Sequence, residues 1–252
     1  MSGHSKWSTI KRKKGALDAK RGKMFTRAIK EITIAVKEGG SPDPDANPRL
    51  RLAVSNAKGI NMPKDNIERA IKKASDQNSE SYEELTYEGY APNGIALFIE
   101  TSTDNQNRTV ANIRAIFNKY NGSLGTNGSL EFIFDRKGMF TIDKSAIGDM
   151  DEDEFEMELI DGGAQDVERE DEVFVAYTTM EDFGNMQKKL EELNIEVKNA
   201  ELQRIPNTTK SLPVDEAQKI LNIVEKFEDD DDVTNVYHNL ELTEELMNSM
   251  DQ

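Results

Sequence analysis

Apolar residues recur at helical spacing near the start of the chain, most clearly between residues 16 and 37. The repeating positions are Met24, Ala28, Ile32 and Ala35, with Phe25, Ile29 and Val36 beside them. This spacing predicts a helix with one apolar face. Basic residues separated by three, four or seven positions fall on the opposite face, which we expect to be open to phosphates. The pair Gly39-Gly40 predicts the end of this helix.

Two further helices are predicted before residue 76. Pro48 follows Asn47, and this pair favours a helix start because asparagine caps helix N-termini and proline suits the first turn. Asn61-Met62-Pro63 predicts the start of the third helix, and apolar residues at helical spacing follow both starts. Three amphipathic helices with short links predict a small helical domain, for which a helix-turn-helix is one compatible arrangement.

From residue 85 onward, short apolar runs predict strands that alternate with helices. We expect strands at 85–90, 94–101, 130–134, 139–142, 173–177, 195–205 and 233–237. Asp104 or Asn105 is expected to cap a helix that stops near Gly122. Acidic residues 151–160, the segment after Thr179 and the segment after Pro213 predict three more helices. Residues 139–205 are assigned the split β-α-β-β-α-β arrangement of ferredoxin-like domains, of which three strands and both helices are placed here.

The last helix and strand are expected to complete the sheet that begins at residue 85, which makes residues 139–205 an insertion. The predicted class is therefore α+β, with a helical N-terminal domain followed by two ferredoxin-like α/β domains, one inserted in the other. The expected domains are 1–78, basic and helical; 79–138 plus 206–252, discontinuous; and 139–205, inserted.

The net charge of −16 hides a strong division along the chain. Residues 1–75 hold 18 Lys/Arg and 7 Asp/Glu, a net of +11, whereas residues 76–252 have a net of −27. A clustered basic segment is the expected electrostatic footprint of a protein that meets a polyanion. The division therefore predicts a nucleic-acid or ribosome surface at the N-terminus and an acidic remainder.

A basic arm precedes the first helix and is expected to neutralise phosphates. Trp7 either stacks on an unpaired base or packs onto the helical domain, and the sequence leaves both open. Phosphate contacts position a protein without reading sequence, so sequence specificity is not predicted. The candidate nucleic-acid-binding residues are His4, Lys6, Trp7, Lys11, Arg12, Lys13, Lys14, Lys20, Arg21, Lys23, Arg27 and Lys30.

The search for catalytic chemistry is mostly negative, so we expect no enzyme, no cofactor and no metal. The absence of cysteine excludes disulfides and thiolate metal sites. No Walker-type loop, zinc-ligand spacing or nucleophile elbow occurs. The run Asp229–Asp232 is better explained as a solvated loop than as a magnesium site. His238 is better explained as a packed histidine than as a general base.

The sequence also favours a cytoplasmic protein without a membrane partner. The N-terminal residues contain no apolar core of the kind found in signal peptides. The longest clear apolar run, Gly94–Ile99, is far shorter than the ~20 residues that span a bilayer. The oligomeric state is not predicted.

Several long motifs resemble the YebC/PmpR family and together span nearly the whole chain. Near the N-terminus they are Gly3-His4-Ser5-Lys6-Trp7, Asp18-Ala19-Lys20-Arg21-Gly22-Lys23, Asn47-Pro48-Arg49-Leu50-Arg51 and the run from Asn61 to Ile71. Later matches are Tyr87-Glu88-Gly89-Tyr90, Thr103-Asp104-Asn105, Asn107-Arg108-Thr109, Asp231-Asp232-Val233 and the run from Asn235 to Asn239.

The resemblance implies a three-domain α+β protein that acts as a probable transcriptional regulator and binds DNA. It also implies an alternative, because similar proteins, including a mitochondrial translational activator of cytochrome oxidase, act on ribosomes. In that alternative the chain binds ribosomal RNA and eases synthesis of difficult, proline-rich stretches. Two departures from the family pattern are notable. Asn93 stands in a loop that is usually glycine-rich, and we expect it to keep the turn because asparagine tolerates a left-handed conformation. Gln106 stands where a basic residue is common, which weakens the case for phosphate binding by that loop.

Overall fold

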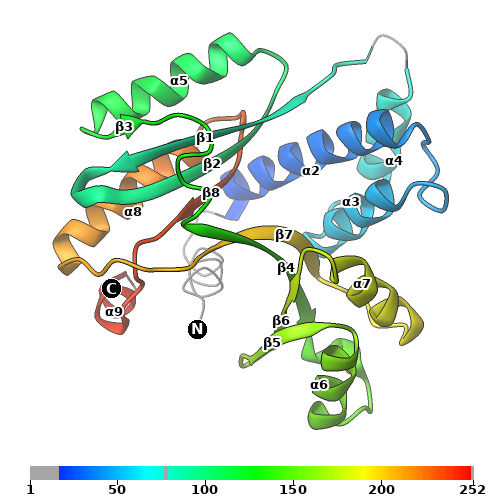
Figure 1. The fold of residues 1–252 in the computed structure, drawn as a ribbon. Helices are drawn as coiled ribbons and strands as arrows, with labels where there is room; N and C mark the ends of the chain where they lie inside the picture. Colours follow the sequence, from blue (N-terminus) through cyan, green and yellow to red (C-terminus); the bar gives the residue numbers. More distant parts are fainter. Residues whose placement is uncertain (1–16, 77–78, 251–252) are drawn as a thin grey trace. The chain divides into compact units, whose positions relative to one another are not determined.

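The computed structural model describes residues 17–76 and 79–250, and its described part begins with three helices (Figure 1). These are α2 (Leu17–Gly39), α3 (Pro48–Gly59) and α4 (Lys64–Ala74). Gly40 follows α2 with a φ of +65°, which suits glycine. The Asn47 side chain accepts the N–H of Leu50 at 3.1 Å and donates to the carbonyl of Ala35 at 2.7 Å. The predicted end of the first helix and the Asn47 cap are confirmed.

The first sheet has the strand order β3-β1-β2-β8. Its strands are β1 (Glu83–Ala91), β2 (Ile95–Thr103), β3 (Ser123–Leu124) and β8 (Val233–His238). Its helices are α5 (Gln106–Lys119), α8 (Val214–Glu228) and α9 (Glu244–Met250). Strand β2 pairs antiparallel with both β1 and β8. The predicted return of the chain end to the sheet begun near residue 85 is therefore confirmed.

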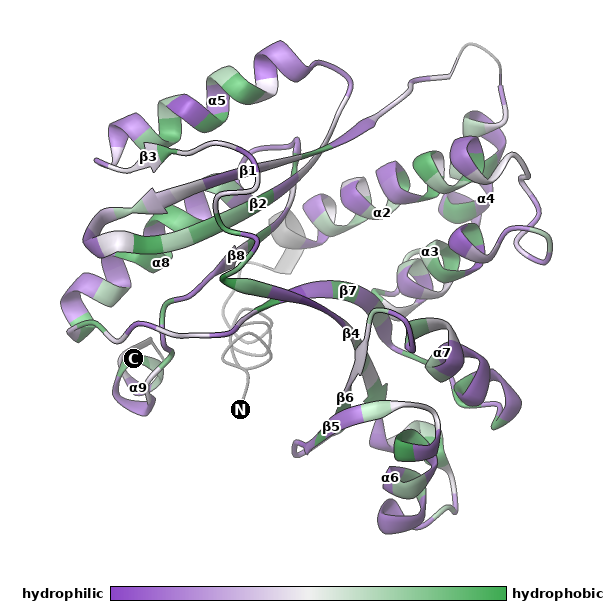
Figure 2. Cartoon of the chain, viewed as in Figure 1, coloured by the Kyte–Doolittle hydropathy of each residue, from purple (hydrophilic) through white to green (hydrophobic). Residues whose placement is uncertain are grey.

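Strand β2 lies at the centre of this sheet and is buried on both faces. Leu97 and Ile99 belong to the apolar core that α5 and α8 share. Phe98, one position out of phase, lies in a separate cluster on the opposite face, because successive strand side chains alternate between faces. Figure 2 shows hydrophobic residues concentrated along β2.

The turn between β1 and β2 explains the departure at Asn93. The turn is a short 3-10 segment, η1 (Pro92–Gly94), in which Asn93 has a φ of 61°. Asparagine adopts this left-handed region more readily than most residues. Asn93 therefore keeps the turn although the loop is not rich in glycine, as the sequence predicted.

The second sheet has the strand order β5-β6-β4-β7. Its strands are β4 (Phe134–Asp143), β5 (Ala164–Arg169), β6 (Val173–Thr179) and β7 (Asn199–Pro206). Its helices are α6 (Glu152–Asp161) and α7 (Phe183–Glu192), and a 3-10 segment, η2 (Lys144–Ile147), follows β4. The element order and strand order are those of a ferredoxin-like domain. The predicted α+β class with one inserted sheet domain is confirmed.

One predicted strand, 130–134, is wrong. Residues 130–133 form a turn, and β4 runs without interruption from Phe134 through the charged residues expected to separate two strands. The turn forms because the buried carboxylate of Glu88 accepts the N–H groups of Gly128 at 2.7 Å and Leu130 at 2.5 Å. Those backbone bonds replace the ladder bonds that a strand would make.

Other strand bounds also differ from the sequence prediction. Strand β7 begins at Asn199 rather than residue 195. Asn194, just before, has a φ of 55°, which is incompatible with an extended strand. Strands β3 and β5 have no counterpart among the predicted strand ranges. Strand β3 has only two residues, which are too few to show alternation.

The chain divides into two compact units. Of the described residues, unit 1 contains 17–23, 80–135 and 205–250, and unit 2 contains 24–76, 79 and 136–204. Unit 2 thus combines the helical segment with the second sheet, whereas the sequence assigned them to different domains. The three-domain division stays a prediction. Within the described residues, no helix is long and apolar enough to cross a membrane.

Direct contacts between α3 and β7 hold unit 2 together. Asn56 donates to the carbonyl of Ala200 at 2.8 Å and accepts the N–H of Ala200 at 2.9 Å, as a neighbouring strand would. A Cβ added at Gly59 would lie 1.7 Å from the carbonyl oxygen of Lys198. Leu52 packs against the apolar core of the second sheet. The helical segment and the inserted sheet are therefore closely packed.

Candidate nucleic-acid interface

The predicted nucleic-acid-binding residues fall into two groups, of which one can be located. The arm residues His4, Lys6, Trp7, Lys11, Arg12, Lys13 and Lys14 lie outside the described residues, as does the side chain of Lys20. The two interpretations of Trp7 therefore stay open. The other group is Arg21, Lys23, Arg27 and Lys30, which lie on α2.

Exposure decreases along this basic series of α2. Arg21 is exposed, Lys23 and Arg27 are half-buried, and Lys30 is only 8% exposed. The expectation that Lys30 lies on an open face is wrong. The helix is enclosed on several sides there, since Ile32, Thr33, Ile34, Ala35 and Val36 are all buried. Conversely, Met24 and Ile29, expected on the packed face, are 42% and 37% exposed.

Lys23 is engaged within unit 1. Its Nζ lies 2.8 Å from the carboxylate of Asp229 and 3.1 Å from the Asp229 carbonyl oxygen. The hydrogen bond from Lys23 is the main reason why the pKa of Asp229 lies below its ordinary value, and Lys226 adds to the effect. Lys23 must exchange this partner before it can contact a phosphate.

A second set of basic side chains, absent from the predicted list, is exposed on α3 and α4. Lys72 and Lys73 occupy the last turn of α4, where the helix dipole favours cations. Both lysines were counted in the positive net charge of residues 1–75, but that count did not single them out. Their exposure in the structure is what makes them candidates for phosphate contacts. The exposed members of this set, called the α3/α4 basic group below, are Lys58, Lys64, Arg69, Lys72 and Lys73.

Other basic residues of the helical segment serve the fold. Arg49 lies 3.1 Å from a carboxylate oxygen of Glu31 and also pairs with Glu38. Arg51 donates to the carbonyl of Pro44 at 3.1 Å. These bonds link α3 to α2 and to the loop between them. Arg49 and Arg51 are therefore weaker candidates for phosphate contacts than the α3/α4 basic group.

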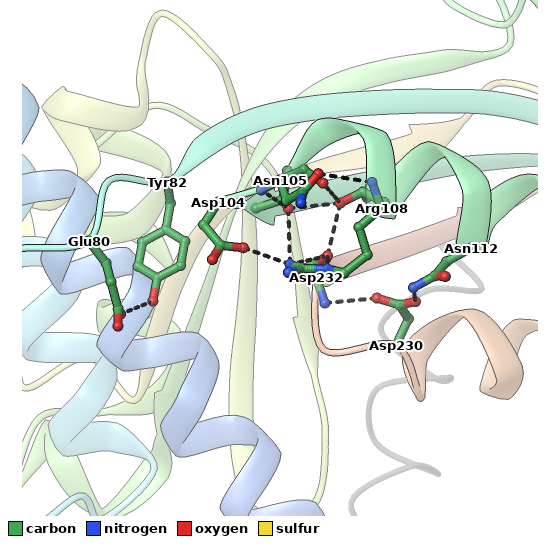
Figure 3. A network of polar contacts seen from close by, with 10 residues as sticks. Glu80, Tyr82, Asp104, Asn105, Arg108, Asn112, Asp230 and Asp232 are labelled. Atoms are coloured by element: carbon green, nitrogen blue, oxygen red, sulfur yellow. Dashed lines mark hydrogen bonds and ion pairs between the residues drawn. The ribbon is translucent and has the colours of Figure 1, made fainter.

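In unit 1, a polar network surrounds the start of α5 (Figure 3). Asn105 caps this helix, since its side chain accepts the N–H of Arg108 at 3.1 Å. The Arg108 guanidinium contacts Asp232 at 2.7 Å and Asp104 at 2.7 Å, and these hydrogen bonds raise the pKa of Arg108. Asp232 also accepts the hydroxyl of Thr109 at 2.9 Å. The alternative Asp104 cap is therefore excluded.

The acidic run after α8 is only partly the solvated loop that the sequence predicted. Asp232 is buried, with a side chain 6% exposed, and Asp230 accepts the Asn112 amide at 2.9 Å. These bonds attach the run to α5, and they explain why Asp232 is buried instead of solvated as predicted. Among the residues described by the structure, no group of three His, Cys, Asp or Glu could hold a metal ion.

Carboxylates dominate the surroundings of this network. Tyr82 has a raised pKa, first because of burial and then because it donates to Glu80 at 2.7 Å, and Asp104 and Asp232 also contribute. Gln106, at the position where the family often has a basic residue, hydrogen-bonds to Glu83. Such an acidic environment disfavours phosphate. The network therefore supports the fold and is a less suitable place for a phosphate than the basic helices.

His238 is the only histidine among the described residues. It lies in β8 opposite Leu97 of β2 and is 1% exposed. This burial supports the packed interpretation over an accessible general base.

The sequence matches the patterns of two family domains along most of its length. The TACO1/YebC protein N-terminal domain matches residues 5–77, and the TACO1/YebC second and third domain matches residues 82–240. Among named relatives, a probable transcriptional regulatory protein of Chlorobium phaeobacteroides is 49% identical over 100% of both chains. One of Clostridium tetani is 50% identical over 97% of this chain and 99% of its own.

A solved structure is also similar. The crystal structure of a conserved hypothetical protein from Aquifex aeolicus has a TM-score of 0.79 at 39% sequence identity, and the match covers 90% of this chain and 93% of that one. Sequence patterns, relatives and fold agree over the same residues. The chain therefore belongs to the TACO1/YebC family.

Proposed function

We propose that this protein regulates transcription by binding DNA through its basic N-terminal helical domain, residues 1–78, and that it is not an enzyme. Its relatives in Chlorobium phaeobacteroides and Clostridium tetani are named probable transcriptional regulatory proteins. The observation that carries the DNA-binding part is the division of charge, with +11 in residues 1–75 and −27 in the rest. A cytoplasmic location fits this role.

The exposed side chains of α3 and α4 support this proposal. The α3/α4 basic group presents exposed cations to solvent. Arg69 and Lys64 contact neighbours on α4 itself, whereas Arg49 links α3 to α2. Cations that neutralise phosphates release the ions condensed on the duplex, which drives binding. The acidic domains, proposed as 79–138 plus 206–252 and 139–205, repel DNA and restrict contact to the N-terminal domain.

The test is crosslinking of the intact protein to nucleic acid in cells, followed by sequencing. Promoter DNA among the crosslinked fragments is the expected result. The variant Lys72→Glu/Lys73→Glu should lower the yield severalfold. The matched control Lys188→Glu/Lys219→Glu changes the net charge equally at exposed lysines of α7 and α8, and should leave the yield near that of the parent.

Ribosomal RNA presents the same phosphates, so the ribosome-associated alternative uses the same basic surface. Crosslinked fragments dominated by ribosomal RNA, together with co-sedimentation of the protein with ribosomes, would contradict the DNA proposal. They would instead support a ribosome-associated translation factor. Equal affinity for promoter and random duplexes, with the same salt dependence, would also count against a transcriptional regulator.

A further inference from the structure

Helix α6 packs on the second sheet through one side only. Phe155 and Leu159 are fully buried, and the ring of Phe155 lies 5.1 Å from that of Phe174 in an edge-on arrangement. Gly162, at the end of the helix, lies close to Met186 of α7. The inner side of α6 is therefore fixed by the core of unit 2.

The flanks of α6 are also occupied, by ion pairs. Glu158 pairs with Lys189 of α7. On the other flank, Arg169 of β5 contacts Asp153 at 2.6 Å and Glu156 at 2.7 Å. These pairs set the rotation of the helix and neutralise the carboxylates nearest the sheet.

The remaining outer side of α6 carries large apolar side chains. Met157 is 64% exposed and Ile160 is 55% exposed. Residues three apart are neighbours on a helix surface, so the two form one continuous apolar area. Glu154 and Asp161 are exposed beside them. A single exposed apolar residue is ordinary, but an adjacent pair within a highly charged segment is not explained by the packing of this chain.

The charge around this pair is strongly negative. Residues 149–172 contain thirteen Asp/Glu and a single basic residue, Arg169, which is held by Asp153 and Glu156. The field over the outer side of α6 therefore attracts cations and repels phosphates. Nucleic acid and anionic membranes are unsuitable occupants, and so is the same face of a second copy.

We propose that the outer side of α6, defined by Glu154, Met157, Ile160 and Asp161, is a docking surface for a lysine- and arginine-rich protein segment with apolar anchors. The carboxylates select positive charge, and Met157 and Ile160 receive the anchors. Methionine suits such a role because its flexible thioether adapts to different partners. An amphipathic helix binds by laying its apolar face against apolar side chains of its partner, which Met157 and Ile160 supply here. The proposal goes beyond DNA binding and does not depend on it.

The test uses the full-length protein and a labelled helical peptide patterned with lysine and leucine, followed by fluorescence anisotropy. A second peptide keeps every lysine and replaces each leucine by serine. We expect the first peptide to bind at physiological salt and the second to bind at least about tenfold more weakly, because apolar burial contributes most of the difference. Amide exchange should slow in α6 when the first peptide binds.

Substitutions test whether the peptide binds at the outer side of α6. Met157→Ser/Ile160→Ser and Glu154→Lys/Asp161→Lys should each weaken binding at least about tenfold, which corresponds to ~1.4 kcal/mol. Phe132→Ser removes a comparable exposed apolar side chain of unit 1 and should change nothing. Equal binding of the two peptides, parent affinity of Met157→Ser/Ile160→Ser, or protection confined to other helices would each overturn the proposal. The crosslinking test of DNA binding is unaffected by either result.

Discussion

At the scale of single residues, Asp232 connects the start of α5 to the segment before β8. Its buried carboxylate accepts hydrogen bonds from Arg108 and from Thr109, while its backbone carbonyl accepts the N–H of Ser102 at 2.8 Å. Arg108 has two carboxylate partners, but only Asp232 is buried, whereas the side chain of Asp104 is 50% exposed. The two carboxylates should therefore differ sharply in their contributions to stability.

The variant Asp232→Asn tests that difference. It keeps the shape of the side chain but turns one acceptor into a donor that faces Arg108. We expect the free energy of unfolding to fall by about 2 kcal/mol, because a buried hydrogen-bonded group loses its partners. Asp104→Asn is the matched control and should change stability little, since exposed ion pairs contribute little. Equal effects in urea denaturation would refute this account of the network.

The ion pair of Lys23 predicts a pH effect. The pKa of Asp229 is lowered mainly by Lys23, so the pair stabilises the fold above the ordinary pKa of aspartate and loses this contribution as pH falls through the folded pKa. Lys23→Ala should raise the pKa of Asp229, as measured by NMR titration of its carboxyl carbon. Lys188→Ala, which removes a cation elsewhere, should leave that pKa unchanged. An unaltered Asp229 titration in Lys23→Ala would contradict the pairing.

At the scale of elements, the contact of α3 with β7 depends on Gly59. A methyl group there would meet the Lys198 carbonyl oxygen, so Gly59→Ala should lower the free energy of unfolding by about 1–3 kcal/mol. Gly184 of α7 has nothing within 4 Å of an added Cβ. Gly184→Ala should instead raise stability by about 0.4–1 kcal/mol, because alanine restricts the unfolded chain. Thermal unfolding of both variants shows whether each substitution lowers or raises stability. A more stable Gly59→Ala would contradict the close contact between Gly59 and the Lys198 carbonyl oxygen.

Element positions followed from the sequence where the local signal was strong. Asn47-Pro48, Gly39-Gly40 and the turn at Asn93 were each predicted from conformational preferences of the residues themselves. The predicted strand at 130–134 does not form, because the buried carboxylate of Glu88, which is distant in the sequence, accepts backbone N–H groups of Gly128 and Leu130. Local periodicity contains no information about such a partner.

At the scale of the whole molecule, the sequence predicted the division of charge and the fold class. It did not predict which basic side chains are exposed. The sequence placed Lys30 on an open face, but neighbouring segments bury it. It also passed over Lys72 and Lys73, because a charge count does not show which cations are exposed and which, such as Arg49, join one helix to another. Such distinctions depend on tertiary contacts.

The central claim is that the N-terminal basic residues bind DNA phosphates. Its most direct test is the affinity of the intact protein for duplex DNA over a range of salt concentrations, compared with the variant Lys11→Ala/Arg12→Ala/Lys13→Ala/Lys14→Ala. If all four arm residues contact phosphates, the slope of log K against log salt should become shallower by roughly 3–4 in the variant, at ~0.9 per phosphate contact. An unchanged slope, or a parent protein that does not bind duplex DNA at low salt, would contradict the claim.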